Sequence, residues 1–145
     1  MIEIVGNIWT FHDKKKWVAI TTNGYIKSNG CAVMGAGVAA QCVNRYPSAP
    51  RLLGEFMNTM GNVVIPFYRQ YRLVSFPVKH NWWEKVDTDL IEQSAYLLVE
   101  FVGDEGIEEI YLPRPGCGNG NLNWSTVFPI LKPIFDDRFK IVELR

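Results

Sequence analysis

Short apolar runs recur along the chain and predict the strands of a β-sheet. Six runs are rich in β-branched and aromatic residues and are bounded by Gly, Pro, Asn or Asp, which is typical of strands. They are residues 2–5, 17–20, 63–65, 73–76, 110–112 and 141–144. The pattern therefore predicts a sheet of about six strands.

Helical periodicity appears between these runs, first in residues 36–46. The apolar residues that share one face of this predicted helix are Val38, Ala39, Cys42, Val43 and Tyr46. Pro47 disfavours helical angles at the residue before it. We therefore expect the helix to end at Tyr46.

Two further helices are predicted in the second half of the chain. One covers residues 88–102, with Asp87 or Thr88 as its N-terminal cap. The other follows Asn123 and covers residues 124–135. Two prolines lie inside it, and each removes a backbone donor, so it is expected to be kinked or broken.

Strands that alternate with helices at this spacing predict an α/β protein. We expect a three-layer α/β/α sandwich, with helices on both faces of a mixed, mostly parallel sheet. No linker, repeat or low-complexity segment interrupts the pattern, so residues 1–145 are expected to form a single domain.

The composition is that of an ordinary globular domain. The 145 residues are 48% hydrophobic and 21% charged, which excludes disordered, collagenous and coiled-coil chains. Neither a long apolar run nor a basic segment followed by an apolar one is present, so no membrane span or signal peptide is expected. Three cysteines without CxxC spacing favour a reducing, cytoplasmic compartment. Two histidines leave little material for a metal site.

The formal net charge is zero, but the charges are separated along the chain. Residues 14–79 hold nine basic residues and one acid, a net charge of +8, whereas residues 84–109 hold nine acids and one base, a net charge of −8. One interpretation is two solvated faces that attract each other. The other is a basic side that faces an anionic ligand, with an acidic back.

Two glycine-rich loops each follow a predicted strand and precede a predicted helix, within residues 21–38 and 113–122. Glycine lets backbone amides approach a ligand closely, and the following helix N-terminus favours an anion such as phosphate. One such loop alone is better explained by a tight strand-to-helix turn, but two together favour a ligand that is bound from both sides, as a diphosphate is. Neither a GxxxxGKS/T nor a GxGxxG motif is present, so spacing alone predicts only a phosphate-bearing small molecule.

Several segments resemble those of a known family. ITTNGYIKSNGCAVMGAGVAAQ resembles the first ligand loop of a macro domain, the ADP-ribose-binding α/β/α module, and LPRPGCGNGNLNW resembles that family's second loop. The opening VGNIWTF is similar to its first strand and turn. SFPVKHNWWEK and the long second loop resemble the branch of the terminal ADP-ribose glycohydrolases and the bacterial antitoxins that remove ADP-ribose from DNA. With the last strand, the resemblance spans essentially the whole chain.

The resemblance implies binding roles in three places. Asn7 stands where the family commonly has an aspartate for the adenine amino group, and Ile8 would offer its backbone N–H nearby. Thr21 and Asn23 stand near the asparagine of the distal ribose. The amides for the proximal phosphate would come from Val33, Gly35, Ala36, Gly37 and Val38. The other phosphate and the distal ribose would be wrapped by Pro115, Gly116, Cys117, Gly118, Asn119 and Gly120.

The resemblance also implies that Lys79, which follows a predicted strand, is catalytic at the anomeric carbon of the distal ribose. A lysine amine attacks only when deprotonated, which needs desolvation or neighbouring cations, and His80 with a cover from Trp82 or Trp83 would supply these. Alternatively, Lys79 stays charged and assists the leaving group or holds phosphate, or it is a surface lysine. Of the two tryptophans, we expect one in the core and one exposed.

The second loop departs from part of the family. Some relatives carry an aspartate that assists hydrolysis, in a GCGLD-type sequence, and Gly120 takes its place here. The DNA-directed antitoxin relatives share the GCGNG form, so the change points towards them and leaves the proton-transfer partner of Lys79 unidentified. Cys117 is interpreted as a small loop filler and not as a nucleophile.

Three functions follow from the resemblance. The first is an ADP-ribosyl hydrolase that removes ADP-ribose from a modified target, for which a DNA base is one candidate. The second is a non-catalytic module that binds ADP-ribose or a related NAD derivative. The third is a phosphatase that acts on ADP-ribose 1″-phosphate. None requires a metal or other cofactor. We expect a monomer whose partners are ADP-ribose or an ADP-ribosylated substrate, nucleic acid among them, and no membrane.

Overall fold

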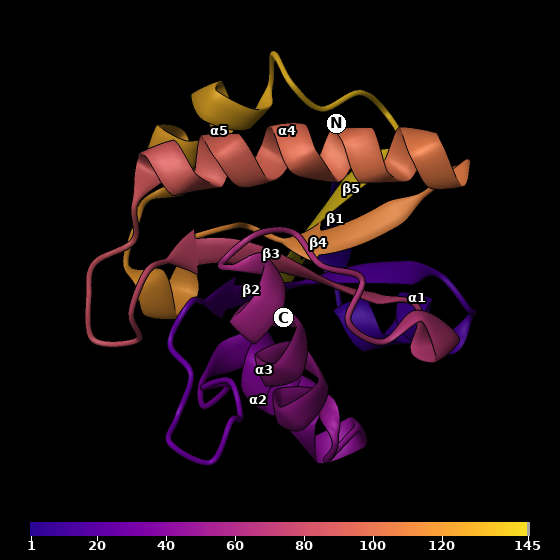
Figure 1. The fold of residues 1–145 in the computed structure, drawn as a ribbon. Helices are drawn as coiled ribbons and strands as arrows, with labels where there is room; N and C mark the ends of the chain where they lie inside the picture. Colours follow the sequence, from indigo (N-terminus) through magenta and orange to yellow (C-terminus); the bar gives the residue numbers. More distant parts are fainter. Residues whose placement is uncertain (145) are drawn as a thin grey trace.

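The computed structural model describes residues 1–144 (Figure 1). In chain order the elements are β1 (Ile2–Gly6), α1 (Ile8–Asp13), β2 (Trp17–Asn23), α2 (Gly37–Arg45), α3 (Ala49–Met60), the 3-10 helix η1 (Arg69–Tyr71), β3 (Leu73–Lys79), α4 (Thr88–Glu105), β4 (Ile110–Pro113), the 3-10 helix η2 (Gly118–Gly120), α5 (Trp124–Leu131) and β5 (Phe139–Leu144).

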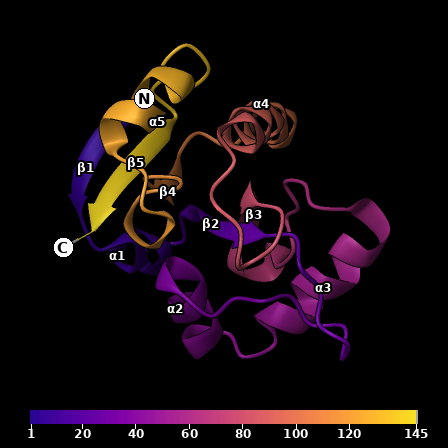
Figure 2. The ribbon, with the colours of Figure 1, turned by 90° about the vertical axis from the view of Figure 1, so that its left-hand side faces the viewer.

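The five strands form one sheet in the order β1-β5-β4-β2-β3, and every pairing between them is parallel. Parallel strands need crossover connections, which carry α4 and α5 over one face and α1, α2 and α3 over the other (Figures 1 and 2). The predicted three-layer sandwich is therefore confirmed. All carboxyl ends of the strands lie at one edge of the sheet, which Figure 2 faces.

The predicted strand at residues 63–65 does not form a ladder with the sheet. Its backbone instead bonds to Ser75 of β3: Ile65 N donates to Ser75 Oγ at 2.9 Å, and Ser75 Oγ donates to Val63 O at 3.0 Å. Pro66 follows at once and has no N–H with which to continue the pairing. The segment therefore covers the outer edge of β3 as an irregular strap, and the sheet has five strands.

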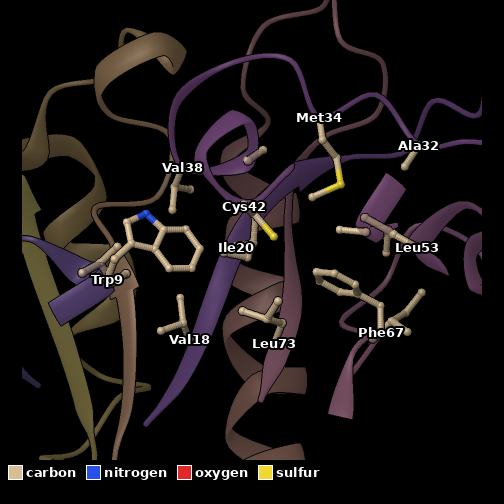
Figure 3. Packing of buried hydrophobic residues seen from close by; sticks show 14 of the residues in the cluster. Trp9, Val18, Ile20, Ala32, Met34, Val38, Cys42, Leu53, Phe67 and Leu73 are labelled. Atoms are coloured by element: carbon tan, nitrogen blue, oxygen red, sulfur yellow. The ribbon is translucent and has the colours of Figure 1, made fainter. Parts of the chain in front are cut away.

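Each face of the sheet buries its own core. On one face, Val18 and Ile20 of β2 pack with Cys42 of α2 and Leu53 of α3, and all four side chains are fully buried (Figure 3). Because side chains alternate along a strand, Ala19 points into the other core, which lies between the sheet and α4 and α5. The two cores fix the sheet, so the loops at its carboxyl edge are held by both helical layers.

The three predicted helices form near their predicted limits. α2 ends at Arg45, because Tyr46 before the proline has φ −133°. Asp87 caps α4 by accepting the Asp89 amide at 2.9 Å, and α5 contains Pro129 and ends at Leu131. None of the helices within residues 1–144 is both long and apolar enough to cross a membrane.

The sequence pattern missed α1 and α3. α1 has six residues, too few for a periodic pattern. α3 has Pro50 in its first turn and Gly54 in its interior, and both residue types are more typical of loops than of helices. A Cβ on Gly54 would lie 2.0 Å from Gly30 O, so the glycine is required by close packing of the helix against the first glycine-rich loop.

Candidate functional site

A cleft of about 390 Å³ opens at the carboxyl edge of the sheet. It lies where the loops after β2, β3 and β4 meet, which is where open parallel sheets bind ligands. Its lining residues are Thr21, Thr22, Asn23, Val33, Met34, Gly35, Ala36, Gly37, Val38, Ala39, Val78, Lys79, Trp82, Pro113, Arg114, Gly116, Cys117, Gly118, Asn119 and Gly120. The structure thus brings both glycine-rich loops and Lys79 to one cleft.

The first glycine-rich loop delivers the N-terminus of α2 to the cleft. Gly37 has φ +57° at the start of the helix, and no side chain caps the first turn, so its amides face outward. Asn23 holds the loop: its Nδ2 donates to Val33 O at 3.2 Å, and its Oδ1 accepts the Tyr25 amide at 3.0 Å. Uncapped amides at the positive end of a helix favour an anionic group.

The second glycine-rich loop is shaped by positive φ angles at Gly116 (+75°) and Gly118 (+69°). It approaches the first loop closely, since a Cβ on Gly37 would lie 3.0 Å from Asn119 Nδ2. Val86, which does not line the cleft, packs against the loop, and a Cβ on Gly120 would lie 2.7 Å from its Cγ2. The two loops therefore present backbone to the cleft from opposite sides.

Lys79 ends β3 and is half-buried in the wall of the cleft. Its carbonyl accepts Asn62 Nδ2 at 2.9 Å, and the next carbonyl, that of His80, accepts the Gly24 amide at 3.0 Å. A bulge in β2 between Thr22 and Asn23 shifts the register beside it. These contacts fix the backbone of Lys79 at the junction of β2 and β3.

Thr22 is a site residue that sequence reasoning missed. It lines the cleft and is 5% exposed, and its Oγ1 has no hydrogen-bond partner within residues 1–144. A buried hydroxyl without a partner is costly, so a ligand oxygen in the cleft is its natural partner. The sequence could have indicated Thr22, because it lies between Thr21 and Asn23, which the resemblance places near the distal ribose.

The other lining residues that sequence reasoning missed are mostly apolar. They are Met34, Ala39, Val78, Pro113 and Arg114. The guanidinium of Arg114 is engaged elsewhere: its Nη2 lies 3.4 Å from Glu3 and 3.3 Å from Glu143, and it packs over the Trp124 ring at 5.0 Å. No side chain in the lining set carries a carboxylate or an imidazole.

Three predicted site residues do not line the cleft: Asn7, Ile8 and Pro115. Asn7 Oδ1 caps α1 by accepting the Trp9 amide at 3.0 Å. The side chains of Ile8 and Pro115 are buried. An adenine contact at the end of β1 stays a prediction.

The neighbours of Lys79 differ from the sequence expectation. His80 Nε2 lies 2.7 Å from Asp87 Oδ2, and this hydrogen bond holds the pKa of Asp87 below its usual value. The expectation of one core and one exposed tryptophan is wrong, because Trp82 is 53% and Trp83 59% exposed. Burial raises the pKa of Cys117, against the charge of Arg114, so the thiol form is favoured and the loop-filler interpretation is supported.

The charge separation follows the helical layers and not the ligand edge. Exposed basic residues such as Lys14 and Arg51 belong to the layer of α1 to α3, and exposed acids such as Glu92 and Glu100 belong to α4. Of the nine basic residues in the +8 stretch, only Lys79 lines the cleft. The interpretation of a basic ligand side with an acidic back is therefore replaced by one basic and one acidic helical layer.

Comparison with known proteins places this architecture in a class. No protein-family model matches the chain. It is similar to the macrodomain of Thermus aquaticus DarG, with a TM-score of 0.71 and 20% identity over 99% of this chain and 97% of the other. It is also similar to Thermosipho africanus DarTG in complex with ADP-ribose, with a TM-score of 0.69 and 21% identity over 90% of this chain and 38% of the other. The fold is therefore that of a macro domain.

Curated proteins extend the likeness to sequence. A DNA ADP-ribosyl transferase-DNA ADP-ribosyl glycohydrolase fusion protein of Thermosipho africanus is 26% identical over 129 residues. A DNA ADP-ribosyl glycohydrolase of Mycobacterium tuberculosis is 25% identical over 115 residues. Each alignment covers 73% of this chain and 33% of the relative, so the chain spans about a third of the length of the curated relatives it matches. The resemblance stated from the sequence is confirmed.

Proposed function

We propose that the chain is an ADP-ribosyl hydrolase, which binds ADP-ribose in the cleft and removes it from a modified DNA base. The observation that carries this proposal is that both glycine-rich loops and Lys79 line one cleft at the carboxyl edge of the sheet. Two similar proteins are named DNA ADP-ribosyl glycohydrolases, alone or in a fusion, and a third is described in complex with ADP-ribose. These names support the same assignment. We also propose that residues 1–145 fold as one domain and act as a monomer.

The order of the strands supports an extended path for ADP-ribose along the sheet edge. Asn7 follows β1, the second loop follows β4, the first loop follows β2, and Lys79 ends β3. These strands stand in the spatial order β1-β5-β4-β2-β3, so Asn7 and Lys79 follow the two outer strands and both phosphate loops lie between them. The four steps between neighbouring strands, each about 4.8 Å, give a distance of roughly 19 Å from β1 to β3, along which the whole ligand would lie. The diphosphate would then lie between Gly37 and Gly118.

Hydrolysis adds water across the bond between the distal ribose anomeric carbon and the base, so the base leaves with a proton and the ribose gains a hydroxyl. Lys79 acts in one of two ways. As a free amine it takes a proton from the attacking water, or it bonds to the anomeric carbon as the base leaves and is released when water cleaves that bond; as an ammonium it donates a proton to the departing base. No carboxylate or imidazole lines the cleft, so we assign the acid–base role to Lys79 in the two routes that need one.

The same absence favours a second candidate function, a non-catalytic module that binds ADP-ribose. Gly120 stands where an aspartate would assist hydrolysis, and the lining set offers no other acid. Binding needs only the two backbone loops and the buried Thr22 hydroxyl. The two functions differ in turnover and share the ligand.

Release of ADP-ribose separates them. Wild type, Lys79→Ala and Lys79→Arg are incubated with an ADP-ribosylated single-stranded oligonucleotide and with an ADP-ribosylated protein, and the free ADP-ribose is quantified. We expect wild type to act on the oligonucleotide and Lys79→Ala to lose 100-fold or more in rate, about the range of an acid–base group. If the ammonium is the active form, Lys79→Arg keeps part of the activity, and if the amine is, it keeps none. Lys132→Ala, at an exposed lysine beyond α5, is the charge-matched control.

Calorimetry with ADP-ribose completes the test. Binding without release from either substrate would replace the hydrolase by the binding module. No binding of ADP-ribose at all would overturn both functions. Size-exclusion chromatography with light scattering on the same samples checks the monomer.

A further inference from the structure

Two tryptophans and a tyrosine stand at the mouth of the cleft beyond Lys79. Trp82 is 53% exposed and also lines the cleft, and Trp83 is 59% exposed. Their rings are 5.5 Å apart at an interplanar angle of 88°, and Tyr25 of the first loop meets the Trp83 ring at 5.3 Å. We call Tyr25, Trp82 and Trp83 the aromatic platform. Adjacent indole rings left in water beside a ligand cleft are typical of a binding surface.

The segment between β3 and α4 holds the platform in place. His80 O accepts the Gly24 amide at 3.0 Å, and His80 Nε2 is bonded to Asp87 at 2.7 Å. The Asp87 amide donates to Val78 O at 3.0 Å, which closes the base of the segment. The backbone on both sides of the tryptophans is therefore held by hydrogen bonds, which keeps the segment beside the cleft.

We propose that the aromatic platform stacks on an unpaired nucleobase that neighbours the ADP-ribosylated base in the substrate strand. The inference rests on the proposed function, and it adds a contact outside the ADP-ribose cleft. The modified base is attached to the distal ribose, which the proposed function places at Lys79. Trp82 follows Lys79 by three residues and also lines the cleft. The strand that carries the modified base would therefore extend out of the cleft across the platform.

The chemistry of the platform favours a nucleobase over a protein side chain. Stacking on aromatic faces binds every base, because every base has a π-face, and phosphates are drawn by nearby cations. Lys79 and Lys85 flank the two tryptophans in sequence. The two acids of the segment, Glu84 and Asp87, accept hydrogen bonds from Asn81 and His80 and balance the two lysines in formal charge. The half-exposed aromatic rings, and not a net positive charge, therefore favour a nucleobase.

Binding of an unmodified strand tests the platform without any ADP-ribose. A fluorescently labelled single strand of about ten nucleotides is compared with one that has abasic sites throughout and the same phosphates. Anisotropy gives both dissociation constants for wild type, Trp83→Ala, Trp83→Phe and Tyr96→Ala. Tyr96 is 59% exposed on α4 and serves as the matched aromatic control.

We expect wild type to bind the base-containing strand about 5- to 100-fold more tightly than the abasic strand, as one stacked base contributes. Trp83→Ala brings this ratio towards one, Trp83→Phe keeps most of it, and Tyr96→Ala leaves it unchanged. An unchanged ratio in Trp83→Ala, or equal binding of the two strands by wild type, would overturn the proposal. Unfolding temperatures of all variants exclude a folding defect as the cause.

A second readout separates this proposal from the proposed function. Release of ADP-ribose is measured for the modified base within a strand, within an abasic strand and in a modified peptide. If Trp83→Ala raises the KM relative to wild type for the first substrate and for neither of the others, the result supports the platform. The same dependence with the peptide would assign the surface to a protein carrier and reject the nucleobase. If wild type releases nothing while strand binding still depends on Trp83, the hydrolase fails and the platform stands.

Discussion

Val86 decides which residues the second glycine-rich loop can hold. Its two methyl groups would lie 2.9 Å from a Cβ on Gly116 and 2.7 Å from a Cβ on Gly120. Gly116 also needs its positive φ, whereas Gly120 is not among the residues with positive φ, so the contact alone excludes a side chain at Gly120. An aspartate at this position would require Val86 or the loop to shift. Glycine at this position is therefore consistent with the packing of the loop against Val86.

The Val86 contact makes a reciprocal prediction. Gly120→Ala is expected to weaken ADP-ribose binding by about 5- to 100-fold, because overpacking costs roughly 1–3 kcal/mol. The double variant Gly120→Ala/Val86→Ala is expected to recover most of that loss, since the second change removes the obstructing methyl groups. Calorimetry on the four proteins of this cycle gives the coupling between the two positions.

A control for the cycle is Gly103→Ala on α4, where a Cβ meets nothing within 4 Å. It tests whether any glycine replacement perturbs the chain. Wild-type affinity in Gly120→Ala, or a double variant no better than the single one, would show that Val86 does not set the loop.

At the scale of the elements, the sequence predicts what local physics controls. Four of the five strands and α4 begin at their predicted first residues, and β5 begins two residues before its predicted start, because apolar runs and caps are local signals. α3 was missed because Gly54 reads as a breaker, yet it is required by contact with Gly30, far away in sequence. Residues 63–65 were misassigned because Pro66 ends a pairing that the apolar pattern alone would allow.

Asp87 couples the start of α4 to the segment that carries the tryptophans. Its carboxylate accepts the Asp89 amide at 2.9 Å and bonds to His80 at 2.7 Å. Asp87→Ala is expected to lower the free energy of unfolding by about 1 kcal/mol through loss of the cap. Asp87→Asn is the matched variant, because asparagine caps a helix equally well but does not titrate.

The pH dependence of stability distinguishes these two variants from wild type. The hydrogen bond from His80 lowers the pKa of Asp87 from 3.8, so its ionised form is favoured in the folded protein. A lowered pKa gives stability that is present above the unfolded value and is lost as pH falls through the folded value. Urea unfolding from about pH 6 to about pH 3 should therefore show that the advantage of wild type over Asp87→Asn is constant above about pH 4 and declines as pH falls further. A constant difference over this range would contradict the lowered pKa.

At the scale of the whole molecule, the zero net charge is the sum of two opposite layers. The layers approach each other in two ion pairs, Lys16 with Glu109 at 3.1 Å and Arg69 with Glu105 at 2.8 Å. The sequence revealed the separation but not its direction, because only the fold decides which helices cover which face. The same limit applied to the site: the loops were visible as motifs, whereas the roles of Thr22 and Val86 depend on contacts across the fold.

The two charged layers predict a weak attraction between copies of the chain. Near neutral pH the net charge is close to zero, so opposite faces of neighbouring molecules attract without an opposing net repulsion. Light scattering should give a negative second virial coefficient at about 10 mM salt, where the Debye length is roughly 30 Å, and a value near zero or positive at about 0.5 M salt. The double exchange Lys14→Glu/Glu100→Lys keeps the net charge and reduces the separation, so it should weaken the attraction. If the exchange leaves the low-salt coefficient unchanged, or if wild type shows no dependence on salt, the attraction does not come from the layers.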